Sequence, residues 1–143
     1  MYIAIIAADT KKELMAQFCI AYSGILSRHN ICATQITGKY IQDASGLEIE
    51  QMMEGHSGGA EQIAARVAFD EIDLVIFFRD TGLETPSAST NELLRLCDIH
   101  NIPVATNLAT AEVLVMALDR GDLDWRSFVN PNSEYNRAKR EHR

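Results

Sequence analysis

The sequence predicts a single-domain α/β protein, a three-layer sandwich with a mainly parallel central sheet. Its 143 residues are 47% hydrophobic, which is enough to bury one core. Short apolar runs alternate with helical patterns, as in parallel sheets that helices cover on both faces. The chain carries no internal repeat. We therefore expect one domain over residues 1–143, with a core at 1–129 and a basic tail at 130–143.

Four short apolar runs predict the strands. A strand buried on both faces is mainly apolar over a few residues. The runs at residues 3–7 and 74–78 are wholly apolar, and the other two also contain threonine or glutamine. The runs are Ile3–Ala7, Ile31–Ile36, Leu74–Phe78 and Val104–Thr106.

Helical periodicity predicts four helices between and after these strands. The segments are Lys11–Arg28, Glu61–Phe69, Asn91–Ile99 and Ala111–Leu118. Thr10 with Glu13, and Ser89 with Glu92, match capping boxes, and Thr110 is expected to cap the last long helix. For the polar tail the sequence leaves three possibilities: a disordered segment, a last helix, or an arm that reaches a neighbouring subunit. It favours a solvated tail.

Composition excludes several classes of function. A net charge of −7 argues against binding to nucleic acid or to an anionic membrane. No apolar stretch approaches the roughly 20 residues that span a bilayer, and no basic leader precedes the first apolar run, so we expect a cytoplasmic protein. Cys19, Cys32 and Cys97 are isolated in apolar segments, which indicates core residues. We expect no metal and no cofactor.

Ligands of open α/β sheets bind outside the carboxyl ends of the strands, so residues just after each strand are candidates. Lys12 begins a helix, where it is either solvated or helps to hold an anion. Thr34 and Thr37 precede a glycine, as phosphate-binding hydroxyls do, but Thr-Gly is also an ordinary turn. Asp80 ends a buried strand and is either a functional carboxylate or a loop-stabilising one, with Arg79 beside it.

A glycine-rich loop over residues 54–61 is the remaining candidate. Gly55, Gly58 and Gly59 would let the backbone approach a ligand, or would simply form a tight turn with Ser57 as helix cap. His56 lies in the same loop and titrates near neutrality, as a general acid or base must. A solvated surface histidine is the alternative.

Five motifs, in order, resemble the methylglyoxal synthase family from Ile3 to about Leu118. They are IAIIAADTKK, CATQITG, GHSGGAEQ, DLVIFFRD and LLRLCDIHNIPVATNLATAE. The resemblance implies a Rossmann-like fold and a carbon–oxygen lyase that converts dihydroxyacetone phosphate to methylglyoxal and phosphate. The same fold serves as a regulatory module in carbamoyl-phosphate synthetases and as a domain of a purine-synthesis enzyme.

The resemblance also implies which residues bind the phosphate group. Lys12, Thr34 and Thr37 stand at phosphate-binding positions, as do Gly55, Gly58 and Gly59 of the loop. Ile36 replaces a threonine of the family, and Glu54 replaces a phosphate-binding serine. A carboxylate at residue 54 would repel a phosphate unless it turned away or was paired.

At the catalytic positions the chain departs further from the family. Ala60 stands where the resemblance places the aspartate base, Ser87 where it places a histidine, and Thr90 where it places a second aspartate. Asp9 and Asp80 remain of the acidic set. Loss of a positioned base lowers a rate by about 10²- to 10⁴-fold. The first hypothesis is therefore a divergent homologue that binds phosphate or a phosphorylated small metabolite without ordinary synthase activity.

Two alternatives stay open. One is an active methylglyoxal synthase in which Glu61 and His56 supply the displaced carboxylate and imidazole. The other is an effector-binding regulatory module that acts on a partner protein. The resemblance further implies a homohexamer, in which Arg137 or Arg140 of the tail completes the phosphate site of a neighbouring subunit.

Overall fold

A five-stranded parallel sheet forms the centre of the computed structural model, which describes residues 1–52, 59–83 and 85–142. Within these residues the strand order is β3-β2-β1-β4-β5. The strands are β1 (Tyr2–Ala7), β2 (Asn30–Thr34), β3 (Glu50–Met52), β4 (Leu74–Phe78) and β5 (Val104–Ala105).

The sheet reverses its direction of growth at β1. The chain runs from β1 outward to β2 and β3, and then returns to add β4 and β5 on the other side. Strands β1 and β4 pair in parallel, with Ala7 opposite Phe78 at their carboxyl ends. A reversal of this kind opens a crevice at the carboxyl ends of the two strands, which is where such sheets bind ligands.

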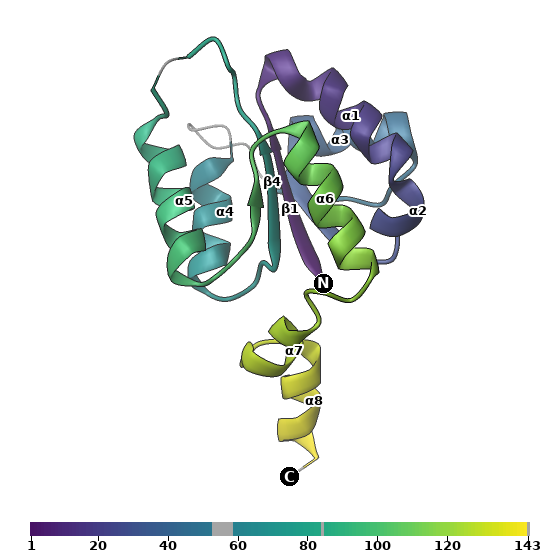
Figure 1. The fold of residues 1–143 in the computed structure, drawn as a ribbon, viewed down its shortest axis with the longest axis vertical. Coiled ribbons are helices and arrows are strands. Elements are labelled where there is room, and N and C mark those ends of the chain that lie inside the picture. The colour runs from purple at the N-terminus through teal and green to yellow at the C-terminus, as the bar shows by residue number, and fades with distance from the viewer. Residues whose placement is uncertain (53–58, 84, 143) are drawn as a thin grey trace.

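Helices cover both faces of the sheet (Figure 1). They are η1 (Asp9–Lys11), α1 (Lys12–Ala21), α2 (Ser23–Leu26), α3 (Gln35–Ser45), α4 (Ala60–Ala68), α5 (Ala88–Ile99), α6 (Leu108–Asp119), α7 (Trp125–Val129) and α8 (Glu134–Glu141). One core cluster contains side chains of α1, α2, α3 and α6, and a second contains those of α4 and α5. The predicted α/β three-layer sandwich is confirmed.

Successive residues of the central strands alternate between the two cores. Ile3 and Ile5 pack into the first cluster, whereas Ala4 and Ile6 pack into the second. Full burial of an isoleucine side chain stabilises a fold by about 1.5–3 kcal/mol. Because both faces are covered, the strands have the continuous apolar sequence that predicted them.

Helix α3 and strand β3 were not predicted from the sequence. Strand β2 ends at Thr34, and the residues expected to continue it begin α3. A β-carbon added at Gly38 would lie 3.1 Å from Cγ of Gln51, so α3 packs on β3 through a residue without a side chain. Packing against β3 outweighs the low helix propensity of this glycine- and threonine-containing segment.

The predicted caps and the first long helix also differ from the structure. The segment 11–28 is divided into η1, α1 and α2, and neither η1 nor α1 has a side-chain cap, so the Thr10 box is not formed. Ser87, rather than Ser89, caps α5, and Asn107, rather than Thr110, caps α6. Both helices start before their apolar periodicity becomes visible, so the true cap lies upstream of the predicted one.

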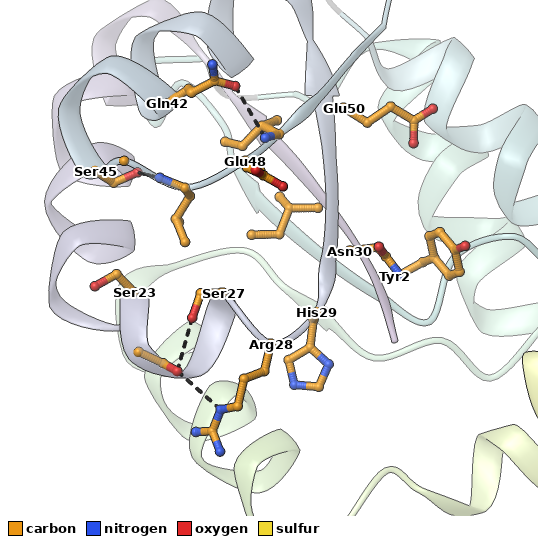
Figure 2. Close-up of a pocket in the computed structure, with 15 residues that line it drawn as sticks. Tyr2, Ser23, Ser27, Arg28, His29, Asn30, Gln42, Ser45, Glu48 and Glu50 are labelled. Atoms are coloured by element: carbon orange, nitrogen blue, oxygen red, sulfur yellow. Dashed lines mark hydrogen bonds between the residues drawn. The ribbon is translucent and has the colours of Figure 1, made fainter.

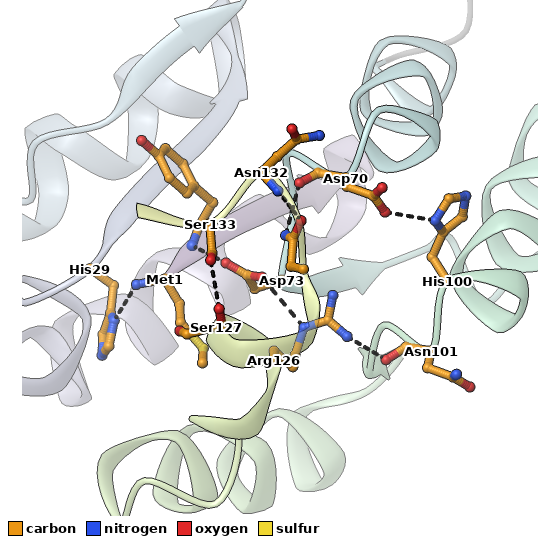
Figure 3. A network of polar contacts seen from close by, with 12 residues as sticks. Met1, His29, Asp70, Asp73, His100, Asn101, Arg126, Ser127, Asn132 and Ser133 are labelled. Atoms are coloured by element: carbon orange, nitrogen blue, oxygen red, sulfur yellow. Dashed lines mark hydrogen bonds and ion pairs between the residues drawn. The ribbon is translucent and has the colours of Figure 1, made fainter. Parts of the chain in front are cut away.

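The C-terminal segment forms the last helix, α8, in which no described residue is buried, and buried polar contacts hold its base to the domain (Figure 3). Arg126 of α7 is 5% exposed; its Nη1 donates to the carbonyl of Asn101 at 2.6 Å and its Nε to Asp73 Oδ1 at 3.4 Å. Asn130 Nδ2 donates to the carbonyl of Asp70 at 3.0 Å. Within the described ranges, no helix has the length and apolarity needed to cross a bilayer.

Candidate functional site

A cavity of about 450 Å³ lies at the carboxyl ends of β1, β2 and β4, at the crevice where the sheet reverses. Strand-end and loop residues line it: Ile6, Ala7, Ala8, Asp9, Lys12, Thr34, Ile36, Thr37, Ala60, Phe77, Arg79, Asp80, Leu83, Thr85, Pro86, Ser87 and Thr90. Every candidate position that follows β1, β2 or β4 is thus brought to one site.

Four helices begin at this cavity. Lys12 is the first residue of α1, Thr34 precedes α3, Ala60 is the first residue of α4, and Ser87 caps α5. All four residues line the cavity. The first N–H groups of a helix have no partner within the helix and carry a partial positive charge. The cavity is therefore suited to an anion although the chain as a whole carries a charge of −7.

Lys12 and Asp9 form an ion pair at the wall of the cavity. Lys12 Nζ lies 2.7 Å from Asp9 Oδ1. This hydrogen bond, together with the positive charge of Lys12, lowers the pKa of the Asp9 carboxyl. The Asp9 side chain is 94% exposed, whereas that of Lys12 is 18% exposed. An ammonium group has three donors, so the pair leaves Lys12 able to donate to a ligand.

Thr34 and Thr37 are both buried and both line the cavity. The backbone of Gly59 approaches Thr34 so closely that a β-carbon at Gly59 would overlap with Cγ2 of the threonine. Gly59 also has a φ of +100°, which favours glycine. The N-terminus of α4 can therefore reach the cavity because residue 59 is a glycine, which has no side chain.

Asp80 and Arg79 follow β4 and share the cavity wall. Asp80 Oδ1 accepts a hydrogen bond from the backbone N–H of Gly82 at 2.9 Å, so the carboxylate stabilises a turn as well as facing the cavity. Arg79 Nη1 donates to the carbonyl of Leu83 at 3.4 Å. Arg79 was not predicted to be a site residue, although its place directly after a buried strand is the signal that selected Asp80.

Ser87 and Thr90 pair with each other. Their hydroxyl oxygens lie 3.0 Å apart, and Ser87 Oγ accepts from the backbone N–H of Thr90. Ala8 and Ala60 contribute no polar side-chain atom. The wall formed by these four residues thus offers hydroxyl groups but no side chain that titrates near neutral pH.

Glu61 does not line the cavity. It lies on α4 and accepts a hydrogen bond from Ser89 Oγ of α5 at 3.3 Å. The structure therefore gives no support to Glu61 as a displaced base. The loop candidates Gly55, His56 and Gly58, with Glu54 and Ser57, lie outside the described residues.

Arg137 and Arg140 lie on α8, at the opposite end of the molecule from the carboxyl ends of the strands (Figure 1). Arg140 Nη1 donates to the carbonyl of Pro131 at 2.7 Å. Neither arginine lines the cavity of its own chain. A contribution to a phosphate site by either one would have to come from a neighbouring subunit.

A larger hollow of about 940 Å³ lies at the opposite end of the strands, beside the amino ends of β1 and β2 (Figure 2). Two of its polar side chains are already engaged. Arg28 pairs with Asp119 at 2.6 Å, and His29 Nδ1 lies 3.1 Å from the amino group of Met1. The smaller cavity, with helix N-termini around it, is the stronger candidate for a functional site. In the described part of the chain no cluster of side chains has the arrangement of a metal site.

A family model described as the MGS-like domain matches residues 15–106. The chain belongs to the methylglyoxal synthase-like family. Relatives named "Methylglyoxal synthase" match nearly the whole length of this chain. The protein of Caldicellulosiruptor saccharolyticus is 55% identical over 139 residues, 96% of this chain and 99% of the relative. That of Thermoanaerobacterium thermosaccharolyticum is 50% identical over 128 residues, 89% of this chain and 96% of the relative.

A solved structure agrees with this methylglyoxal synthase-like fold. The crystal structure of methylglyoxal synthase from Elizabethkingia anophelis NUHP1 superposes with a TM-score of 0.71 at 35% identity. The match covers 80% of this chain and 76% of the solved one. Family and fold are thus established, and they favour the active-synthase alternative over the hypothesis of a protein without ordinary synthase activity.

Proposed function

We propose that the cavity binds a small phosphorylated carbonyl compound of the dihydroxyacetone phosphate class. Lys12, Thr34 and Thr37 form the phosphate subsite. The two threonines and the lysine line one cavity at the N-termini of α1 and α3. An ammonium group, two hydroxyls and unpaired helix N–H groups are all donors, which matches a phosphate group that only accepts.

For the bound ligand we propose the reaction of the named relatives, elimination of phosphate to give methylglyoxal. The observation that carries this proposal is the 55% identity to a methylglyoxal synthase over 96% of the chain. In the reaction a base removes a proton from the hydroxymethyl carbon, the C–O bond to phosphate breaks, and the enol product tautomerises to methylglyoxal.

Asp80 is the group that we assign as the base. Asp9 and Asp80 are the carboxylates that line the described cavity, and Asp9 is paired with Lys12. Asp80 is held through one oxygen by the N–H of Gly82, and no carboxylate–cation pair engages it in the described residues. A carboxylate fixed through one oxygen can use the other to accept a proton.

Binding without turnover is the second candidate, and a specific observation favours it. Ala60, Ser87 and Thr90 line the cavity at positions where the family resemblance implies an aspartate, a histidine and a second aspartate. The two hydroxyls also hydrogen-bond to each other, and neither is a base at neutral pH. A role as an effector-binding module follows from the same features if a partner protein senses the bound ligand.

An assay of methylglyoxal formation from dihydroxyacetone phosphate separates the two candidates. The first predicts saturable turnover that Asp80→Asn lowers by about 10²- to 10⁴-fold, the usual effect of losing a positioned base. The matched control Glu61→Gln removes a charge next to the cavity and leaves turnover unchanged. Saturable binding of the ligand with no methylglyoxal above the uncatalysed rate would instead support the second candidate.

A homohexamer in which Arg137 or Arg140 completes a neighbour's site remains part of the proposal. Because α8 lies far from the cavity of its own chain, only an assembly would give these arginines access to a ligand. Light scattering would report the number of subunits. Truncation after Asn130 should lower both that number and the affinity for phosphate, and unchanged values of both would contradict the assembly.

A further inference from the structure

Arg79 gives the cavity a second cation, and no carboxylate of the described residues pairs with it. Among the described residues its guanidinium makes one hydrogen bond, to the carbonyl of Leu83 at 3.4 Å, and no ion pair. A guanidinium has five N–H donors in a planar fork. Most of the donors of Arg79 therefore have no partner among the described residues, and the side chain lines the cavity.

Arg79 and the phosphate subsite come from different elements. Arg79 follows β4, whereas Lys12 begins α1 after β1 and Thr34 ends β2. Strand β1 lies between β2 and β4 in the sheet. A ligand phosphate held by Thr34 is thus separated from Arg79 by the width of the central strand. The cavity of about 450 Å³ has room for a ligand that spans both positions.

The charges of the cavity wall also favour a second anionic group on the ligand. Lys12 is neutralised in part by Asp9, at 2.7 Å, while Arg79 has no such partner among the described residues. Asp80, the adjacent carboxylate, directs Oδ1 to the N–H of Gly82. A guanidinium binds a carboxylate or a phosphate through two parallel N–H···O bonds, so a second oxyanion on the ligand would suit Arg79.

We infer that the cavity binds a metabolite with two oxyanionic groups, a phosphate at Lys12 and Thr34 and a carboxylate or second phosphate at the guanidinium of Arg79. This inference rests on the proposed phosphate site and extends the ligand class beyond dihydroxyacetone phosphate, which carries one oxyanionic group.

Calorimetric titration with a matched pair of ligands tests the inference. 3-Phosphoglycerate and glycerol 3-phosphate share a three-carbon chain and a phosphate, and differ in a carboxylate that replaces a hydroxymethyl group. The wild-type chain should bind 3-phosphoglycerate about 10-fold more tightly or better, as a charge-assisted bidentate contact provides. Arg79→Gln should remove this preference and leave the affinity for glycerol 3-phosphate unchanged.

Two further variants sharpen the test. Arg79→Lys keeps the charge without the planar fork and should retain part of the preference. Arg120→Gln makes the same change of charge at an arginine that pairs with Asp122 outside the cavity, and should behave as wild type. Propane-1,3-diol bisphosphate shows whether the group at Arg79 is a second phosphate or a carboxylate. The inference is supported if either this compound or 3-phosphoglycerate binds more tightly than glycerol 3-phosphate.

Equal affinity of the wild type for all three ligands would overturn the inference, as would a preference that survives Arg79→Gln. Failure of the proposed phosphate site gives a different result. In that case inorganic phosphate would not bind, or would bind equally well to Lys12→Met. Circular dichroism and thermal unfolding of each variant establish that the fold is kept.

Discussion

Gly59 lies against Thr34 so closely that a side chain at Gly59 would overlap with the threonine methyl group. The glycine also adopts a φ of +100° directly before α4. Two features of the cavity, the N-terminus of α4 and the hydroxyl of Thr34, are therefore placed by one residue that has no side chain.

Gly59→Ala should destabilise the protein and weaken phosphate binding together. Backbone strain at positive φ costs about 1–2 kcal/mol, and the overlap with Thr34 adds to it. Urea unfolding measures the first effect and calorimetric titration with inorganic phosphate the second. Gly24→Ala is the matched control, because nothing lies within 4 Å of a β-carbon there and the residue is helical. Equal effects of the two substitutions would contradict the close approach.

Arg126→Met should lower the free energy of unfolding by about 3–5 kcal/mol. Methionine replaces the apolar part of the arginine side chain, but the half-buried Asp73 carboxylate loses its cation. A charge left without its partner in such a position lowers the stability of the fold. The carbonyl of Asn101 also loses a donor. Arg120→Met, at an exposed pair with Asp122, should cost less than about 1 kcal/mol. Similar urea midpoints for both variants would show that the network in Figure 3 does not anchor α7.

The buried cysteines predict a loss of stability at alkaline pH. Burial raises the pKa of the Cys19 thiol to about 12 and those of Cys32 and Cys97 to about 11, from an ordinary value of 9.0. Above pH 9 the unfolded chain releases thiol protons that the folded chain retains. Folding is therefore penalised as pH rises from 9 toward the folded-state values, by up to about 1.4 kcal/mol per pH unit for each thiol.

Urea unfolding at pH 8 and pH 10 in the presence of a reductant measures this effect. Lysines and tyrosines titrate in the same range, so the comparison is with Cys19→Ala, whose stability should fall less steeply with pH than that of the wild type. Identical slopes for the two proteins would show that the Cys19 thiol is not protected from ionisation.

If the cavity binds its ligand without turnover, Ala60→Asp should raise the rate of methylglyoxal formation by about 10-fold or more. The residue is buried at the cavity wall and is the first of α4, where a carboxylate is stabilised by the helix macrodipole. The new group would stand where the family resemblance implies the base. Ala60→Asn has the same size without the charge and should not raise the rate. A gain shared by both variants, or absent from Ala60→Asp, would contradict a base at this position.

The fold was predictable because its central strands are buried on both faces. The apolar runs at β1 and β4 have no other explanation in a chain of this length, and the structure confirms them. Helix α3 was not predictable, because local propensity disfavours it and tertiary packing stabilises it, with Ile41 in the first core cluster and Gly38 against β3. Tertiary packing of this kind leaves little trace in the local sequence.

The position of the candidate site followed from the rule that ligands bind at the carboxyl ends of strands. The rule brought Lys12, Thr34 and Asp80 to one cavity, as the structure shows. Glu61 follows Ala60 on α4 and does not line the cavity, because neighbouring helical residues point about 100° apart. The rule could not rank Arg79, because the absence of a carboxylate partner among the described residues is a property of the folded state.

Phosphate binding at Lys12 tests the central claim most directly. Lys12 provides the one ammonium group among the described residues of the cavity wall, so Lys12→Met should weaken the binding of inorganic phosphate by about 10-fold or more. Lys39→Met, on the exposed face of α3, is the control for a change of net charge. We expect saturable phosphate binding to the wild type and to Lys39→Met, and a markedly lower affinity for phosphate in Lys12→Met. Absence of binding to the wild type, or equal affinities of all three proteins, would contradict it.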